Sequence, residues 1–97
     1  MSGFDYAGDR RWRKLRERVL RRDQYLCREC RRFGRITEAT IVHHIWPVED
    51  FPEYSFAPWN LISVCHGCHD KFHERLSRQL TADGLRWKNK TPPPPSG

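Results

Sequence analysis

Four cysteines form two pairs whose spacing is typical of a metal site. The first pair is Cys27 and Cys30. The second is Cys65 and Cys68, and 34 residues separate the two pairs. Four thiolates are the tetrahedral ligand set that structural zinc prefers, although two disulfides or a redox-active pair remain the alternative interpretation. We expect zinc, because its binding contributes roughly 10–16 kcal/mol, more than the apolar core of so short a chain supplies.

The histidines form a second group that could do chemistry. All five lie between residues 43 and 73. His69 and His73 are four residues apart and would share one face of a helix, while His43 and His44 are adjacent. Three imidazoles can bind a divalent ion and leave positions for water and substrate, which is typical of a catalytic site. A pair of surface histidines on a helix is the alternative.

The spacing of apolar residues indicates which elements hold these side chains. Trp12, Leu15 and Val19 recur at steps of three and four, which predicts a helix over about 9–22 with Asp9 as its N-cap. The β-branched and aromatic run 40–46 predicts a strand.

The second half of the chain is predicted to contain a strand and a helix. Residues 47–59 are rich in proline and predict an ordered loop, and 60–64 are short and apolar, which predicts a second strand. Apolar residues spaced by four predict a helix from about His69 to Gln79, ended by Asp83 and Gly84. These apolar residues are Phe72, Leu76 and Leu80.

Positive charge is concentrated near one end of the chain. The net charge is +6, yet residues 9–32 alone carry eleven basic and four acidic side chains. Such segregation is expected of an element that faces a polyanion, and guanidinium groups pair with phosphate in a bidentate way. A solvated helix face is the alternative. The expected DNA-binding residues are Arg10, Arg11, Arg13, Lys14, Arg18, Arg21 and Arg22.

The sequence also indicates the cellular compartment of the protein. No apolar run approaches the roughly 18 residues of a membrane span, and residues 1–6 do not begin a secretory signal. We therefore expect a cytoplasmic protein without a membrane partner. In that reducing compartment, paired cysteines bind metal more often than they form disulfides.

The order of these motifs over residues 12–73 resembles the HNH endonuclease family, in particular its small phage-type members with a tetracysteine zinc site. The motifs are Trp12-x-x-Leu15, Val19-Leu20-x-x-Asp23-x-Tyr25-x-Cys27-x-x-Cys30, Val42-His43-His44-Ile45-x-Pro47, Asn60-Leu61 and Cys65-x-x-Cys68-His69-x-x-x-His73. The resemblance implies an α+β chain with the small β-β-α metal fold (His-Me finger), an N-terminal basic helix and a tetracysteine zinc site. We expect one HNH nuclease domain over 1–90, with its β-β-α core at about 40–80, and a disordered proline-rich tail over 91–97.

The resemblance also implies roles for individual residues. The histidine, asparagine and histidine that name the family look like His44, Asn60 and His73. His43, His69 and His73 would ligate the catalytic metal. His44 would be the general base, and Asn60 would hold the loop and orient His44 by hydrogen bonding. Neighbouring side chains on a regular strand point to opposite faces, so we expect a twist or bulge at His43 and His44.

The sequence does not determine which metal ion binds at the histidine site. Imidazole ligands favour zinc, nickel, cobalt or copper, while the resemblance implies magnesium or manganese as well. We expect the thiolate site to be closed and resistant to mild chelation, and the histidine site to be open and exchangeable. His66 matches no family role and is expected to be a surface residue or a phosphate contact.

The implied function is that of a metal-dependent DNA endonuclease. It would hydrolyse phosphodiester bonds with low sequence specificity, either nicking the duplex or cutting both strands. The phage-type resemblance further implies service in phage genome packaging, with terminase or portal proteins as partners and the host cytoplasm as location. We expect a monomer, with a dimer as the alternative. A non-catalytic zinc-ribbon module that binds nucleic acid would explain the cysteines and arginines, but not the histidines.

Overall fold

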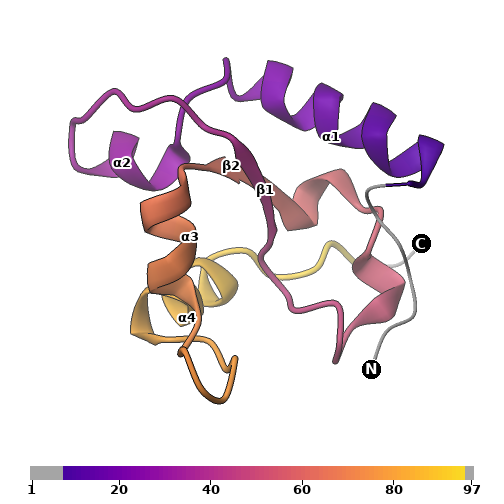
Figure 1. Ribbon diagram of the computed structural model, residues 1–97. Helices are drawn as coiled ribbons and strands as arrows, with labels where there is room; N and C mark the ends of the chain where they lie inside the picture. Colours follow the sequence, from indigo (N-terminus) through magenta and orange to yellow (C-terminus); the bar gives the residue numbers. More distant parts are fainter. Residues whose placement is uncertain (1–7, 96–97) are drawn as a thin grey trace.

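A two-stranded antiparallel sheet lies at the centre of the fold, with helices from both halves of the chain around it (Figure 1). The computed structural model describes residues 8–95. In chain order the elements are α1 (Arg10–Arg22), α2 (Arg28–Arg32), β1 (Ile41–His44), the short 3-10 turns η1 (Pro52–Tyr54) and η2 (Pro58–Asn60), β2 (Leu61–Val64), α3 (His66–Phe72) and α4 (Ala82–Asn89). The succession β1, β2, α3 confirms the expected α+β class and the β-β-α core.

Helix α1 forms as its apolar spacing predicts. Asp9 caps it, because its carboxylate accepts a hydrogen bond from the Trp12 N–H at 2.9 Å. Trp12, Leu15 and Val19 are buried and pack with Leu61 of β2. The arginine-rich faces are left in solvent, so burial of one stripe places the basic residues on the outside of the molecule.

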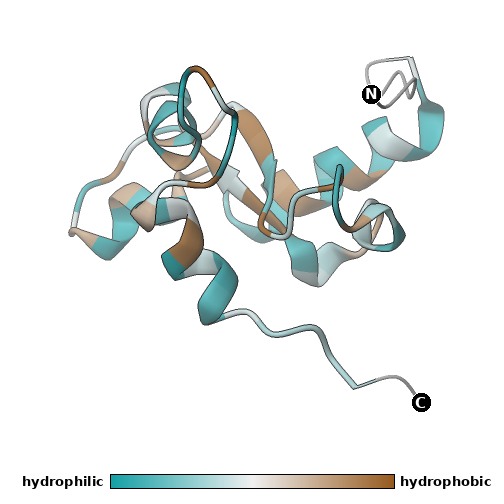
Figure 2. Ribbon diagram, turned by 90° about the horizontal axis from the view of Figure 1, so that it is seen from below, coloured by the Kyte–Doolittle hydropathy of each residue, from teal (hydrophilic) through white to brown (hydrophobic). Residues whose placement is uncertain are grey.

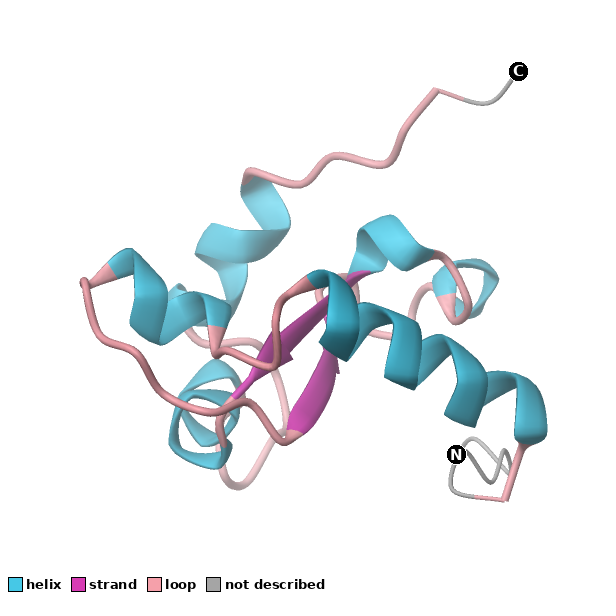
Figure 3. Ribbon diagram, turned by 90° about the horizontal axis from the view of Figure 1, so that it is seen from above, coloured by secondary structure: helices cyan, strands magenta, loops and turns pink. Residues whose placement is uncertain are grey.

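The sheet separates α1 from α3 (Figure 3). On the face toward α3, Ile62, Val64 and Phe72 form a core with the cysteines, and Ile45 joins it from the residue after β1. Both strands are short, and all four residues of β2 are buried. Side chains on one face of this small sheet therefore lie toward α1, and those on the other face lie toward α3.

Helix α3 differs from the helix predicted over 69–79. It begins three residues earlier and ends at Phe72, since the backbone of His73 is extended at φ −127° and ψ 142°. The last turn is closed by a contact remote in sequence, the Thr81 N–H that donates to Phe72 O at 2.9 Å. Leu76 is fully exposed. The spacing of four that suggested a longer buried stripe is therefore coincidental.

The chain after residue 80 also differs from the prediction. Asp83 and Gly84, expected to end a helix, lie in the first turn of α4, whose N-cap is Thr81. A Cβ atom on Gly84 would lie 2.6 Å from Phe72 O, so glycine is needed where α4 approaches the end of α3. The buried Trp87 ring donates from Nε1 to Glu29 Oε1 at 2.9 Å, which ties α4 to α2.

The proline-rich segment leads away from the body of the protein (Figure 2). Residues 92–95 have no regular secondary structure, and Trp46 Nε1 donates to Thr91 O at 2.7 Å just before them. The predicted disorder of 91–97 stays a prediction, as does the boundary of the 1–90 domain; residues 1–7 and 96–97 lie outside the described residues. Within 8–95, no helix is long and apolar enough to cross a membrane.

Candidate metal centre and active site

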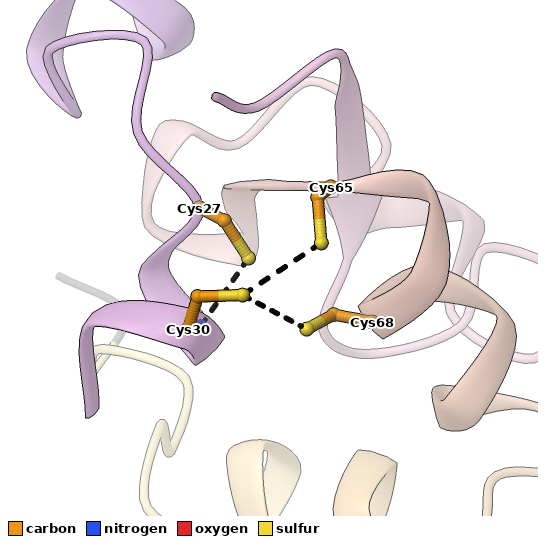
Figure 4. A group of neighbouring side chains, drawn as sticks. All are labelled: Cys27, Cys30, Cys65 and Cys68. Atoms are coloured by element: carbon orange, nitrogen blue, oxygen red, sulfur yellow. Dashed lines mark hydrogen bonds between the residues drawn. The ribbon is translucent and has the colours of Figure 1, made fainter. Parts of the chain in front are cut away.

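The two cysteine pairs converge on one point (Figure 4). All four Sγ atoms lie within 4.8 Å of one another. Cys30 Sγ is 3.8 Å from Cys65 Sγ and 3.6 Å from Cys68 Sγ, well beyond a disulfide bond length of about 2.05 Å. A tetrahedral ion with Zn–S bonds of about 2.3 Å requires sulfurs about 3.8 Å apart. The spacing fits a metal tetrad, and all four cysteines are free thiols.

The cysteines also connect separate elements. Cys27 is the N-cap residue of α2 and Cys65 is that of α3. Burial raises the pKa of Cys27 and of Cys68, because a thiolate loses solvation there. A hydrogen bond from the Thr37 side chain lowers the pKa of Cys30 to about 7. Four sulfurs this close require a cation before all of them can ionise.

Three histidines form a second cluster on the α3 face of the sheet. His43 comes from β1, His69 from α3, and His73 is the residue that ends α3. Their ring centroids are 5.3 to 5.5 Å apart, and one ring nitrogen from each lies within 4.8 Å of the others. The early end of α3 does not disturb this arrangement, because only the spacing between residues 69 and 73 is required.

The environment of His43 fits a metal ligand. The residue is 2% exposed, and its Nε2 is the one buried side-chain nitrogen or oxygen without a hydrogen-bond partner among the described residues. Burial, followed by the neighbouring His73 and His69, lowers its pKa well below the ordinary value. The ring is thus a neutral imidazole whose unpaired nitrogen faces two others. A divalent cation would satisfy that nitrogen.

His73 is oriented by the turn that follows it. Its Nδ1 lies 3.3 Å from Arg78 O. Since a carbonyl oxygen can only accept, Nδ1 carries the hydrogen and Nε2 keeps its lone pair for the cluster.

His44 approaches the same place from the other side of β1. The expected bulge is absent from the described sheet: His43 pairs with Ile62 and His44 with Leu61 in regular register. The imidazole of His44 stacks on Trp12 of α1 with ring centroids 5.3 Å apart. A cavity of about 140 Å³ at the end of β1 is nevertheless lined by both His43 and His44. Because His44 is the last residue of the strand, no distortion is needed for both rings to reach it.

The hydrogen-bond partner of His44 Nε2 is a main-chain atom. This nitrogen lies 3.1 Å from Ser55 O, so Nε2 carries the hydrogen and Nδ1 keeps the lone pair. Burial lowers the pKa of His44, and the bond to Ser55 O raises it in part. The sequence did not indicate Ser55 as the partner of His44, because any residue type can supply a main-chain carbonyl.

Asn60 acts on the loop between the strands. Its side chain is fully buried, accepts from the Trp46 N–H at 2.7 Å, and donates to Trp46 O at 3.1 Å and Tyr54 O at 3.2 Å. The expected direct hydrogen bond to His44 is instead made by Ser55 O, the residue after Tyr54. Asn60 therefore positions the loop that positions His44.

All seven basic residues of α1 in the expected DNA-binding set are exposed. Arg11 pairs with Asp9 at 3.5 Å and Arg21 with Glu17 at 3.9 Å, both at the surface. Four others have no ion pair with any described residue. They are Arg10, Arg13, Lys14 and Arg18.

Arg22 also makes several hydrogen bonds within the protein, and its place in the expected DNA-binding set stays a prediction. Its Nε and Nη2 donate to the carboxylate of the buried Asp23 at 2.9 and 3.0 Å, and further N–H groups donate to Pro58 O and Leu61 O. Asp23 also accepts from the Ser63 N–H at 3.0 Å. Arg22 thus fastens the end of α1 to β2, while 40% of its side chain stays exposed.

His66 does not join the histidine cluster. It lies on α3 with 77% of its side chain exposed, and its Nδ1 is 3.2 Å from Asp70 Oδ2. This placement agrees with the expected surface residue.

Comparison with known proteins agrees with this fold. Residues 27–75, which contain all the cysteines and histidines, match the family model of the HNH endonucleases. Among solved structures the chain is similar to the HNH endonuclease of the deep-sea thermophilic bacteriophage GVE2, crystallised with manganese, with 37% identity and a TM-score of 0.64. The match covers 67% of this chain and 71% of that one. No curated protein matches. The chain belongs to the HNH endonuclease family and is a nuclease.

Proposed function

We propose that the protein is a metal-dependent DNA endonuclease that hydrolyses phosphodiester bonds at the histidine cluster. The observation that carries this proposal is the unpartnered, buried Nε2 of His43, which lies beside two further imidazoles and shares a cavity with His44. A structural metal site held by three imidazoles does not need a fourth one in the same cavity, whereas a hydrolytic site needs a group that accepts a proton.

The catalytic ion would be held by His43, His69 and His73. A divalent ion there supplies Lewis acidity, which polarises the phosphate and stabilises charge on the leaving oxygen. Three imidazoles suit zinc, nickel or cobalt, whereas magnesium and manganese prefer oxygen ligands and would take water and phosphate oxygens in addition. Manganese is supported by the bacteriophage relative, which was crystallised with that ion.

His44 would act as the general base. Its Nε2–H is held by Ser55 O and its ring lies against Trp12, so Nδ1 is the nitrogen that can take a proton from the attacking water. The lowered pKa keeps this imidazole neutral near pH 7, which is the form that accepts a proton.

The cysteine cluster would hold a structural zinc ion. It joins the beginning of α2 to the beginning of α3, and α3 carries His69 and leads directly into His73. A closed tetrahedral site leaves no position for substrate, so its contribution would be to folding and to the placement of α3.

The exposed side of α1 would contact the DNA backbone. Replacing Arg10, Arg13, Lys14 and Arg18 together by glutamine should weaken duplex binding. It should also make the slope of log K against log salt shallower by about 3.6 if each contacts one phosphate, since the slope is about −0.9 per phosphate. Fluorescence anisotropy across a salt series measures both quantities. Arg22→Gln is the control, because it also removes one positive charge from α1. It should lower the thermal stability and leave the salt slope of DNA binding unchanged. A slope unchanged in the fourfold variant would exclude α1 as the contact surface.

Low sequence specificity follows from the chemistry of that surface. Its outward side chains are guanidinium and ammonium groups, which position a protein on phosphates and carry no base information by themselves. We further propose that the nuclease acts in phage genome packaging, supported by its similarity to a bacteriophage enzyme. Co-purification of terminase or portal proteins with the tagged protein from infected cells tests this role. Sedimentation tests the expected monomer.

The nuclease proposal is tested on supercoiled plasmid. With manganese the protein should convert it to nicked or linear DNA, and EDTA should stop the reaction. A non-catalytic zinc-ribbon module would shift the plasmid on a gel without cutting it. Binding without cleavage under magnesium, manganese, zinc, nickel and cobalt alike, in zinc-loaded folded protein, would exclude the catalytic function.

A further inference from the structure

A cleft lies beside the histidine cluster on the side away from α1. It has a volume of about 490 Å³ and is lined by His69, Asp70, His73, Glu74, Arg75 and Arg78. The two arginines belong to the turn between α3 and α4, which Figure 1 shows at the far end of α3 from the sheet. The cleft thus continues directly from two of the proposed metal ligands.

The turn has a fixed shape. The Glu74 N–H donates to Gln79 O at 2.8 Å, and the Arg78 N–H donates to Glu74 O at 3.0 Å. Arg78 has a φ of +63°, a left-handed conformation that is uncommon for residues other than glycine. Its carbonyl is the group that orients His73. The arginine side chains are therefore carried by the same turn that fixes a metal ligand.

The acidic side chains of the cleft have partners within the protein, whereas the side chains of its two arginines have none among the described residues. Asp70 contacts His66 at 3.2 Å, and Glu74 accepts from the Ser77 hydroxyl at 3.2 Å. Neither guanidinium, by contrast, has a hydrogen bond or ion pair with another side chain in residues 8–95. Two unpaired guanidinium groups beside a hydrolytic centre suit a phosphate, which they can bind through bidentate hydrogen bonds.

We propose that Arg75 and Arg78 form a subsite for the DNA backbone phosphate next to the one that is cleaved. This inference rests on the proposed endonuclease function. It places the DNA strand across the end of β1, with α1 on one side of the histidine cluster and the 74–79 turn on the other. The two contacts on opposite sides of the cluster would bind the DNA strand equally in the ground and transition states.

The test compares a DNA duplex with a substrate that has no neighbouring phosphate. The variants are Arg75→Gln, Arg78→Gln and the double variant, and the small substrate is bis(p-nitrophenyl) phosphate. For the duplex, KM should rise about tenfold for each arginine, as expected from the loss of one charge-assisted hydrogen bond. The duplex kcat should change by less than about twofold, because the interaction is uniform in ground and transition states. Cleavage of the small substrate should be unchanged in Arg75→Gln, because the carbonyl that orients His73 belongs to Arg78, and in Arg78→Gln as long as that main-chain carbonyl is retained.

Salt dependence and a matched control separate this role from a structural one. The salt slope of duplex binding in the double variant should be shallower by about 0.9, the effect of one phosphate. Arg31→Gln removes the same charge from an exposed position on α2 and should retain the wild-type KM. Manganese affinity and zinc content, measured for every variant, should match those of the wild type.

Two results would overturn the subsite. The first is a double variant whose duplex KM and salt slope equal those of the wild type. The second is an equal loss of kcat on both substrates, which would place the arginines at the scissile phosphate or at His73. Failure of the proposed function is distinct, since the wild type would then cut neither substrate. Duplex binding by anisotropy would still decide whether the arginines contact a phosphate.

Discussion

His44→Ala should lower the rate of DNA cleavage by about 10²- to 10⁴-fold, the contribution of general-base catalysis by a positioned side chain. The ring is held between Trp12 and Ser55 O, and in the proposed role of general base its Nδ1 accepts the proton. Alanine removes that acceptor. The proposed metal ligands and the basic face of α1 are untouched. DNA affinity and zinc content should therefore stay at wild-type values. Single-turnover cleavage with manganese, together with anisotropy and metal analysis, measures all three.

Two further variants sharpen this result. His44→Gln keeps an N–H that can donate to Ser55 O but has no basic nitrogen, so it should be as inactive as the alanine variant. His66→Ala removes an exposed histidine from α3 and should cleave at the wild-type rate. A fully active His44→Ala variant would refute the assignment of the base.

Cys68→Ser should leave the protein without zinc and largely unfolded at room temperature. Cys68 is 5% exposed, and its Sγ lies 3.6 Å from Cys30 Sγ. An apolar core of this size contributes only about 3–5 kcal/mol, whereas zinc binding contributes roughly 10–16 kcal/mol. Loss of one of four thiolates removes most of that stabilisation. Circular dichroism with metal analysis detects the change.

His69→Ala provides the contrast for the cysteine variant. It removes a proposed metal ligand from the histidine cluster, which should abolish metal-dependent cleavage while zinc content and thermal stability are retained. Mild chelation of the wild type should remove the metal of the histidine cluster before that of the cysteine cluster. Activity should therefore be lost while the protein is still folded. A Cys68→Ser variant that melts at the wild-type temperature would show that the cysteine cluster does not stabilise the fold through a metal.

Several features of this protein follow from the sequence alone, because they depend on spacing within one element or within one short motif. The stripe of Trp12, Leu15 and Val19 determines both the buried face of α1 and the exposure of its arginines. The spacing of four residues between His69 and His73 indicates that their rings lie close together, and their centroids are 5.4 Å apart although His73 follows the end of α3. The two Cys-x-x-Cys pairs likewise indicate a common site, and the motif order indicates the HNH family, which the family match confirms.

Other features depend on contacts between residues far apart in the chain, and only the tertiary structure decided them. Helix α3 ends at Phe72 because Thr81 bonds its last carbonyl, while the apolar spacing around Leu76 suggested that the helix continued. Arg22 is identical in type to its neighbours on α1, yet main-chain carbonyls of η2 and β2 take its donors.

The candidate active site likewise depends on contacts between residues far apart in the chain. A regular strand directs His43 and His44 to opposite faces, and the sequence therefore suggested a bulge. The cavity at the end of β1 instead admits both rings, and the loop held by Asn60 brings Ser55 O to His44. Residue types and spacing specify which groups can do chemistry, since these are local properties. Hydrogen bonds to main-chain atoms specify how those groups are oriented, and such bonds exist only once the chain has folded.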